Sequence, residues 1–385
     1  MRVLLDGRRL TRPHVQGGAD ASWRQLLPAL LDQANDPKQF SILTSSVVPW
    51  RTGMLSGLAA TGAGVHHHWA SASLMATLGR LGLRTEWLGP GHTDILHLSH
   101  PRWFLRTHAR VVVSVQSLLH HDHPHLFQPK QVARLEEGFR SIAHRVCLWI
   151  CTSEGTRDDL VRLYGVPHGR TVVIYPGTAK AFTTARGNRH LIDRTRNKYG
   201  LDKRSYLVFL GALEPRKNLK NLVDGYEIAL DQGLTSDLAL VGPLGWKSES
   251  ILAACKARPR LQGRLHFPGF LPQDELAHVV AGADAMVHPA FHEGTGITVL
   301  EAMAAGTPVL CSNRGALPEA TGGHALLFVP NDPASIARTM LQIQDDEKQK
   351  KRLQNHGLAH ALKFTWEECA RQTLQAYDLA MTLTK

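Results

Sequence analysis

Hydrophobic positions along the chain fall in short runs separated by longer mixed segments. In the first half, the runs lie at residues 3–5, 42–43, 95–98, 111–115 and 172–174. In the second half, they lie at residues 207–210, 238–241, 265–267, 285–287, 309–310 and 326–329. Such runs predict strands that are buried on both faces, and the intervening segments are long enough for crossover helices. The alternation predicts an α/β fold with two doubly wound parallel sheets.

Local signals place the first helix and the domain boundary. The helix should follow Asp20, which we expect to be its N-cap. Its apolar side chains recur at helical spacing and are Trp23, Leu26, Leu27, Leu30 and Leu31. A polar stretch rich in Gly and Arg, residues 176–204, separates the two halves. We therefore predict one Rossmann-like domain over residues 1–190 and a second over residues 191–365, facing a cleft.

Composition is that of a folded globular protein. The chain has 385 residues, and at roughly 150 residues per domain this length also favours two domains. No apolar run approaches the ~18 residues of a membrane span, and charges occur too early for a signal peptide. We therefore expect a cytoplasmic protein. The five cysteines are scattered without a Cys-x-x-Cys pair, which argues against a disulfide framework or a structural zinc site.

Positive charge is concentrated in the first half of the chain. Residues 1–190 carry a net charge of +10 and residues 191–385 a net charge of +1. The first half also holds six of the eight tryptophans and 15 of the 22 histidines. This composition suits an anionic partner such as a membrane surface, a lipid-linked phosphate or nucleic acid, although a well-solvated surface with core tryptophans explains it equally. A candidate amphipathic contact, which would otherwise pack on the core, comprises Leu74, Leu78, Leu81, Arg80 and Arg84.

Two histidine runs raise the question of a metal site. They are 66-HHH-68 and 120-HHDHPH-125. Adjacent imidazoles in a loop cannot all converge on one ion, and no helical pair spaced i, i+4 stands out. We therefore expect no metal site.

The segment at residues 290–310, AFHEGTGITVLEAMAAGTPVL, has the strongest chemical signal. Its pattern predicts a loop over residues 292–296, between the strand at 285–287 and a helix at 297–305. Gly294 and Gly296 allow a tight turn, so the free N–H groups at the helix start can bind an anion such as a diphosphate.

Two glutamates bracket this predicted turn. Glu293 precedes it, on the sugar side of such an anion, and Glu301 lies about one turn into the helix. A carboxylate at Glu301 can accept two hydrogen bonds from a ribose diol. The pair thus suits a nucleotide diphosphate-sugar, with a structural loop and a solvated glutamate as the alternative.

The same segment, residues 288–310, resembles the E-x7-E signature of retaining glycosyltransferases of family GT4, which have the GT-B fold. Further segments resemble this family in order along nearly the whole chain, at residues 151–167, 210–226, 315–337 and 364–380. The start 6-DGRRL-10 and the residues Glu-Pro-Arg-Lys-Asn at 214–218 resemble its mannosyltransferase-like branch.

The resemblance implies the GT-B fold and a reaction. The second domain would bind a nucleotide diphosphate-sugar, with GDP-mannose suggested as the donor. The first domain would hold a glycan or lipid-linked acceptor, and residues 366–385 would cross back onto it. Such enzymes serve polysaccharide or glycoconjugate synthesis, generally need no metal cofactor, and some work on the inner face of the cell membrane. We expect no nucleic-acid partner.

The resemblance also assigns donor-binding roles. Lys217, with Arg216, would neutralise the departing diphosphate, although an Arg-Lys pair after a strand is more often surface. Glu293 would bind sugar hydroxyls and support the oxocarbenium charge, and Glu301 would hold the ribose. Phosphate or sugar oxygens would meet the backbone of Gly294, Thr295, Gly296 and Ile297.

Two further donor contacts are implied. Phe270 and Leu271 would lie near the base, with a core role as the alternative. Gly17 and Gly18 resemble the family's glycine turn, which faces the phosphates.

The chain departs from its family after the strand at residues 111–115. That strand commonly ends in His-Asp, and here the positions are Gln116 and Ser117. Glutamine can donate and accept hydrogen bonds but carries no proton charge near neutral pH. We expect Gln116 to face the donor sugar in a working enzyme.

Two other classes of function remain to be weighed. The replacement by Gln116 is compatible with a catalytically weak GT-B scaffold that binds a nucleotide-sugar or a partner protein. An NAD-linked oxidoreductase is disfavoured, because no G-x-G-x-x-G motif follows a strand. Measurement of donor hydrolysis would distinguish a transferase from a scaffold, because a transferase transfers some sugar to water and a scaffold does not.

Overall fold

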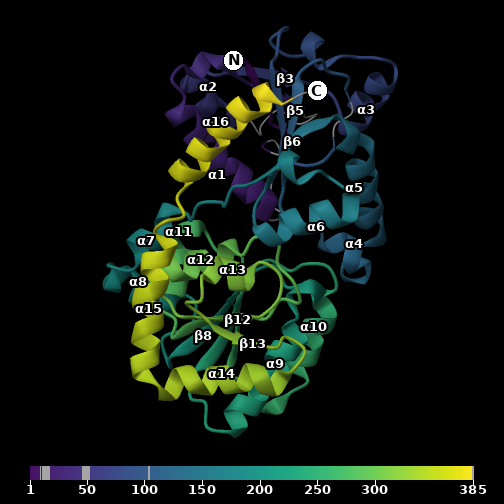
Figure 1. Ribbon diagram of the computed structural model, residues 1–385. Coiled ribbons are helices and arrows are strands. Elements are labelled where there is room, and N and C mark those ends of the chain that lie inside the picture. Colours follow the sequence, from purple (N-terminus) through teal and green to yellow (C-terminus); the bar gives the residue numbers. More distant parts are fainter. Residues whose placement is uncertain (9, 11–17, 46–52, 103–104, 384–385) are drawn as a thin grey trace. The chain divides into compact units, whose positions relative to one another are not determined.

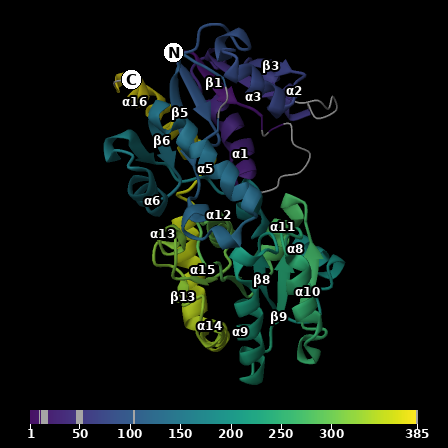
Figure 2. The same cartoon turned by 90° about the vertical axis from the view of Figure 1, so that its right-hand side faces the viewer.

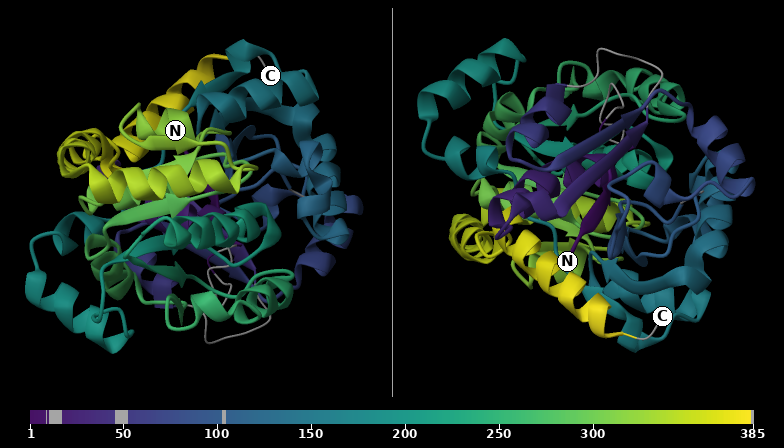
Figure 3. Two further views of the ribbon diagram at one scale, coloured as in Figure 1. Left: turned by 90° about the horizontal axis from the view of Figure 1, so that it is seen from below. Right: turned by 90° about the horizontal axis from the view of Figure 1, so that it is seen from above.

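The computed structural model describes residues 1–8, 10, 18–45, 53–102 and 105–383 (Figure 1). Packing divides the chain into two compact units. Unit 1 comprises Met1–His121, Pro129–Gly177 and Trp366–Lys385, and unit 2 comprises Asp122–Gln128 and Thr178–Thr365. Each unit holds one parallel sheet with helices on both faces (Figures 2 and 3), which confirms the predicted fold class.

The seven-stranded sheet of unit 1 has the order β3-β2-β1-β4-β5-β6-β7. Its strands are β1 (Val3–Asp6), β2 (Phe40–Ser45), β3 (Gly64–His68), β4 (Ile95–Leu98), β5 (Arg110–Val115), β6 (Val146–Cys151) and β7 (Thr171–Val173). Its helices are α1 (Gly18–Gln33), α2 (Gly53–Ala60), α3 (Ala72–Arg80), α4 (Leu119–Asp122), α5 (Pro129–Ile142), α6 (Glu154–Tyr164) and α16 (Trp366–Thr382).

Three details of unit 1 differ from the sequence prediction. Helix α1 begins at Gly18, so Asp20 is a buried residue of its first turn and not the N-cap. Strand β6 was not predicted, although its six residues are all buried. Strand β3 is not among the predicted strands either, and it contains the histidines at 66–68, for which the sequence predicts a loop. This strand lies at the sheet edge, is only half-buried, and its imidazoles hide the apolar signal of a strand.

A buried histidine joins several elements of unit 1. His97 on β4 is fully buried, and its ring nitrogens lie 2.7 Å from the Tyr377 hydroxyl of α16 and 2.8 Å from the Ser114 hydroxyl of β5. The Trp23 ring of α1 packs against the His97 ring in a T-shaped arrangement, with the ring centroids 4.8 Å apart. Burial lowers the pKa of His97 to about 3, so the ring is neutral and offers one donor and one acceptor. This network fixes the last helix beside α1 (Figure 1).

The six-stranded sheet of unit 2 has the order β10-β9-β8-β11-β12-β13. Its strands are β8 (Tyr206–Leu210), β9 (Asp237–Val241), β10 (Leu265–Gly269), β11 (Ala285–His288), β12 (Val309–Ser312) and β13 (Leu326–Phe328). Its helices are α7 (Lys180–Ala185), α8 (Arg189–Lys198), α9 (Leu219–Asp231), α10 (Ser248–Lys256), α11 (Gln273–Ala281), α12 (Ile297–Ala304), α13 (Leu317–Thr321), α14 (Pro333–Asp345) and α15 (Glu347–Ala361).

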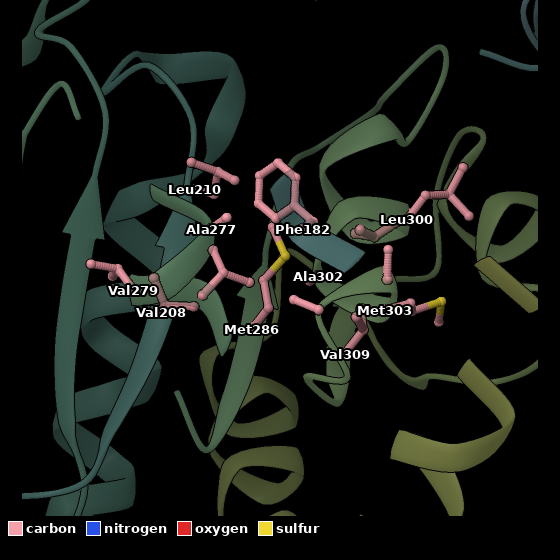
Figure 4. Packing of buried hydrophobic residues seen from close by; sticks show 14 of the residues in the cluster. Phe182, Val208, Leu210, Ala277, Val279, Met286, Leu300, Ala302, Met303 and Val309 are labelled. Carbon is pink, nitrogen blue, oxygen red and sulfur yellow. The ribbon is translucent and has the colours of Figure 1, made fainter. Parts of the chain in front are cut away.

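Alternate residues of each buried strand in unit 2 serve two separate cores. Val208 and Leu210 of β8 pack under α7, α11 and α12 (Figure 4). Leu207 and Phe209 point to the opposite face, where α9 and α14 lie side by side. Burial on both faces explains why these strands are continuous apolar runs in the sequence.

The N-terminal part of unit 1 ends at Gly177, before the predicted domain boundary at residue 190, and the unit also includes Trp366–Lys385. The reason is that α7 and α8 pack on α11 within unit 2. The strand order of unit 2 reverses between β8 and β11, and in such sheets ligands bind beyond the carboxyl ends of the strands at this switch point.

Candidate functional site

The candidate site is formed by the loops that follow β8 and β11 at the switch point of unit 2. The two strands are hydrogen-bonded neighbours, with Ala285 paired to Leu207. The first loop contains a 3-10 turn, Pro215–Lys217, and the second contains Glu293 and leads into α12. Charged residues from distant parts of the sequence therefore emerge side by side.

Asn218 fastens the two loops together. Its backbone is left-handed, with φ 59°, and its side chain is buried. The Asn218 side-chain amide donates to the carbonyl of Pro289 at 3.0 Å and to that of Pro330 at 2.7 Å. The Phe291 N–H donates to the Arg216 carbonyl at 3.2 Å. These bonds set the position of the turn that carries Arg216 and Lys217.

Two glycines support the loop that carries Glu293. At Gly315, with φ 61°, a Cβ atom would stand 2.5 Å from the Glu293 carbonyl oxygen, and the next N–H, that of Ala316, donates to this oxygen at 2.7 Å. Gly296, with φ 75°, precedes α12. Of the two glycines predicted for the turn, Gly296 has the left-handed conformation, whereas Gly294 is a buried residue with ordinary φ.

Glu293 is the centre of a charged cluster. Its Oε1 atom forms an ion pair with Lys217 Nζ and lies 3.4 Å from Arg216 Nη1 and 3.3 Å from His288 Nε2. A second carboxylate, Glu214, lies 2.5 Å from Arg216 Nε. The charges of these two cations and two carboxylates cancel. A bound anion would therefore replace a carboxylate as the partner of Lys217 or Arg216.

Burial and charge act in opposite directions on these groups. Burial lowers the pKa of Lys217, while Glu293 partly restores it. Burial raises the pKa of Glu293, but Lys217, His288 and Arg216 outweigh this and hold it well below the usual range. Burial and the nearby Lys217 lower the pKa of His288, which keeps this ring neutral. Glu293 is therefore a carboxylate, and its ion pair with Lys217 favours the charged form of that lysine.

Glu301 has a different environment. It is half-buried on α12, and among the described residues its carboxyl group has no hydrogen bond or ion pair. Burial raises its pKa to about 8. A carboxyl group in this state gains from any ligand that offers hydroxyl donors.

The start of α12 adds hydrogen-bond donors. The N–H groups of Val299 and Leu300 donate to the Gly296 carbonyl. Those of Ile297 and Thr298 have no partner in the part of the chain that the structure describes, as is usual for the first turn of a helix. Together with the helix dipole they favour an anion. Thr295 and Gly294 lie in the preceding loop.

The other predicted contacts are distributed as follows. Phe270, directly after β10, is 69% exposed, whereas Leu271 is buried in a hydrophobic core, so the core alternative holds for Leu271. Gln116 follows β5 in unit 1 and is half-buried. Gly18 is the first residue of α1, and Gly17 lies outside the described residues.

Sequence reasoning assigned no role to His288 and Asn218. His288 is fully buried and stacks near Phe209, with ring centroids 6.0 Å apart. A histidine as the last residue of an otherwise apolar strand was the available signal. Asn218 directly follows Lys217, and asparagine tolerates the left-handed backbone that this position has.

The described residues offer neither a metal-binding cluster nor a membrane-spanning helix. In that part of the chain, no group of three or more His, Cys, Asp or Glu side chains is placed to hold a metal ion. Across the same residues, no helix is long and apolar enough to span a bilayer.

Comparison with protein families gives two matches. The model described as "Glycosyl transferases group 1" matches residues 192–360, and that described as "Glycosyltransferase Family 4" matches residues 69–180.

Among curated proteins, the chain is 31% identical to O-antigen chain mannosyltransferase B of Escherichia coli over 66% of each chain. It is 30% identical to D-inositol 3-phosphate glycosyltransferase of Streptomyces bingchenggensis (strain BCW-1), over 78% of this chain and 70% of that protein. The chain thus spans about two thirds of the length of these relatives.

Among solved structures, Anabaena HepE in complex with UDP-glucose has a TM-score of 0.75 at 17% identity and covers 98% of this chain and 99% of its own. WaaG, a glycosyltransferase involved in lipopolysaccharide biosynthesis, has a TM-score of 0.69 at 12% identity, covering 98% and 99%. These likenesses confirm the expected GT-B fold.

Glu301→Gln should stabilise the protein increasingly as the pH rises. With the pKa of Glu301 raised to about 8, the folded protein holds a proton that the unfolded chain has already lost. Wild-type stability therefore falls as the pH rises from about 5 to 8, and glutamine removes this loss. Thermal unfolding at about pH 5 and pH 9 measures the gap in Tm between the two proteins. Glu347→Gln, whose side chain is 64% exposed, is the control. A difference in Tm between the wild type and Glu301→Gln that does not change with pH would contradict the raised pKa of Glu301.

Proposed function

Because the chain belongs to glycosyltransferase family 4, we propose that it transfers a hexose from a nucleotide diphosphate-sugar to a glycan or lipid-linked acceptor, with retention of the anomeric configuration. The observation that supports this most is the Lys217–Glu293 pair next to the open start of α12 at the switch point of the second sheet. Polysaccharide or glycoconjugate synthesis is the matching process.

The donor diphosphate would bind between Lys217, Arg216 and the start of α12. When an anion arrives, these cations exchange a carboxylate for phosphate oxygens, and the N–H groups of Ile297 and Thr298 gain an acceptor. A preorganised positive site of this kind also stabilises the charge that develops on the leaving diphosphate. It supplies the role that a metal ion has in other transferases, so we propose that the enzyme is metal-independent.

The two glutamates would hold the two ends of the donor. Glu301, which has no partner among the described residues, would bind the ribose diol. Glu293, released in part from Lys217, would bind sugar hydroxyls and support positive charge at the anomeric carbon. Front-face displacement, in which a leaving-group oxygen assists the incoming hydroxyl, needs no protein nucleophile. Phe270 remains the candidate contact for the base.

Mannose from GDP-mannose is the donor that we propose. The sequence resembles the mannosyltransferase-like branch, and an Escherichia coli relative is named a mannosyltransferase. HepE, by contrast, was solved with UDP-glucose. Thermal-shift measurements with GDP, UDP and ADP separate these donors, because the tightest ligand stabilises the fold most.

A catalytically weak scaffold is the second candidate, because Gln116 stands where the family commonly has a histidine. A transferase leaks sugar to water at a slow rate, whereas a scaffold binds the donor without hydrolysing it.

The first unit would hold the body of the acceptor and contact an anionic membrane surface at its cytoplasmic side. Four large apolar side chains between residues 69 and 87 are exposed: Trp69 at 61%, Leu74 at 49%, Leu81 at 79% and Trp87 at 68%. His68 lies 2.8 Å from the carbonyl of Leu88, which brings the two tryptophan-bearing segments together. The side chain of Arg80 lies outside the described part, and Arg84 contacts His108.

Lys217→Ala and Glu301→Ala should each weaken the binding of a nucleoside diphosphate while leaving the fold intact. At Lys217, loss of a charge-assisted hydrogen bond costs ~1.5 to 3 kcal/mol, or about tenfold to a hundredfold in affinity; at the protonated Glu301, each lost hydrogen bond costs about 0.5 to 1.5 kcal/mol. Calorimetric titration measures the affinity, and circular dichroism checks the fold. Lys220→Ala is the matched control, since Lys220 is exposed and pairs with Asp224. Wild-type affinity in both site variants would place the nucleotide elsewhere.

Gln116→Ala should lower sugar transfer and spare nucleotide binding. Gln116 follows directly on β5, whereas His121 lies several residues farther along and is exposed. His121→Ala should therefore have much less effect. Donor hydrolysis and nucleotide affinity, measured for both variants, test whether Gln116 occupies the position of the family histidine. A larger effect of His121→Ala than of Gln116→Ala would instead place the sugar site at the histidines of residues 120–125.

Binding to vesicles tests the membrane proposal. The protein should sediment with vesicles that contain phosphatidylglycerol and not with pure phosphatidylcholine, because residues 1–190 carry a net charge of +10. The double variant Leu81→Ser, Trp87→Ser should sediment less, because these exposed side chains would enter the interface. Equal sedimentation with both kinds of vesicle, or with neither, would rule out an electrostatic contact.

A further inference from the structure

A cavity of about 510 Å³ lies in unit 2 beside the loop that carries Glu293. Its lining includes His123, His125, Phe291, His292, Arg314 and Asn331. Its volume is that of a site for a small ligand, about a sugar with one substituent. The proposed donor contacts are not among the residues that line it.

The cavity and the charged cluster share a wall. Phe291 and His292 line the cavity and directly precede Glu293, whose carboxylate contacts Lys217 and His288. The bond from the Phe291 N–H to the Arg216 carbonyl, at 3.2 Å, fixes this wall. A ligand in the cavity would therefore lie close to Glu293, which we propose to hold the donor sugar.

Another part of the lining is also held by hydrogen bonds. Pro330, which also lines the cavity, accepts from the side-chain amides of Asn218 at 2.7 Å and Asn221 at 3.1 Å. The Ala316 N–H, two residues after Arg314, donates to the Glu293 carbonyl at 2.7 Å. The walls thus rest on the same bonds that order the site.

The lining has one sign of charge. No Asp or Glu is among the residues that line the cavity. Arg314 is exposed, and within the described residues its guanidinium group has no hydrogen bond or ion pair. Imidazoles of His123, His125 and His292 and the amide of Asn331 add further polar groups. An exposed guanidinium with imidazole and amide groups around it suits a phosphate or carboxylate that is flanked by hydroxyl groups.

We propose that this cavity binds an oxyanion of the acceptor, a phosphate or a carboxylate, and thereby places the acceptor hydroxyl beside Glu293. This inference rests on the proposed function, because it assigns the second substrate of the same site. It also gives Arg314 a specificity role, since acceptors without the anionic group would lose its contact.

Titration of sugars into the nucleotide-saturated protein tests the proposal. A saturating nucleoside diphosphate blocks the charged cluster, and the probes are mannose 6-phosphate, glucuronate and neutral mannose. At least one anionic sugar should bind more tightly than mannose. Arg314→Gln should weaken that binding about tenfold to a hundredfold, and Arg260→Gln, which removes an exposed arginine paired with Asp231, should not. Tighter binding of the phosphate or of the carboxylate identifies the anion.

The proposal fails if all three sugars bind alike, or if Arg314→Gln binds the anionic sugar as the wild type does. It also fails if Lys217→Ala, and not Arg314→Gln, abolishes that binding, because the anion would then occupy the charged cluster. Nucleotide affinity of the wild type, measured first, keeps the two proposals apart. If no nucleotide binds, the proposed function fails, and the same titration without nucleotide still reports on the cavity.

Discussion

The ion pair between Lys217 and Glu293 is the interaction on which the site depends. Both residues lie in loops at the carboxyl ends of neighbouring strands, and Lys217 is almost fully buried. Removing two charges from water is costly, and the Coulomb attraction offsets that cost only when the geometry and the surrounding hydrogen bonds are good. Asn218, His288 and Gly315 supply these conditions. Such a pair is a poor way to stabilise a fold and a good way to keep opposite charges ready for a ligand.

The sequence predicted the second domain well because its strands are buried on both faces. Continuous apolar runs such as Leu207–Leu210 leave little ambiguity, and the E-x7-E segment marked the loop and helix that hold Glu293 and Glu301. Edge strand β3 was missed because three histidines replaced the apolar pattern. Helix α7 was assigned to the wrong domain because packing on α11, and not composition, decides its place.

Side-chain partners were beyond sequence reasoning. The motif assigned Lys217 to phosphate and Glu293 to sugar as separate contacts, whereas in the structure each is the partner of the other. That Glu301 has no partner among the described residues could not be foreseen either, because this follows from the environment of α12 and not from the residue type. Asn218 shows the same limit: its two bonds reach Pro289 and Pro330, far apart in the sequence.

A cycle between Lys217 and the terminal phosphate of the ligand tests the central claim most directly. Calorimetry gives four affinities: the wild type and Lys217→Ala, each with the preferred nucleoside diphosphate and with the matching monophosphate. If Lys217 binds the β-phosphate, the diphosphate loses more affinity than the monophosphate, with a coupling of at least ~1.5 kcal/mol. Equal losses for both ligands would show that Lys217 and the β-phosphate do not interact, and would contradict this account of the site.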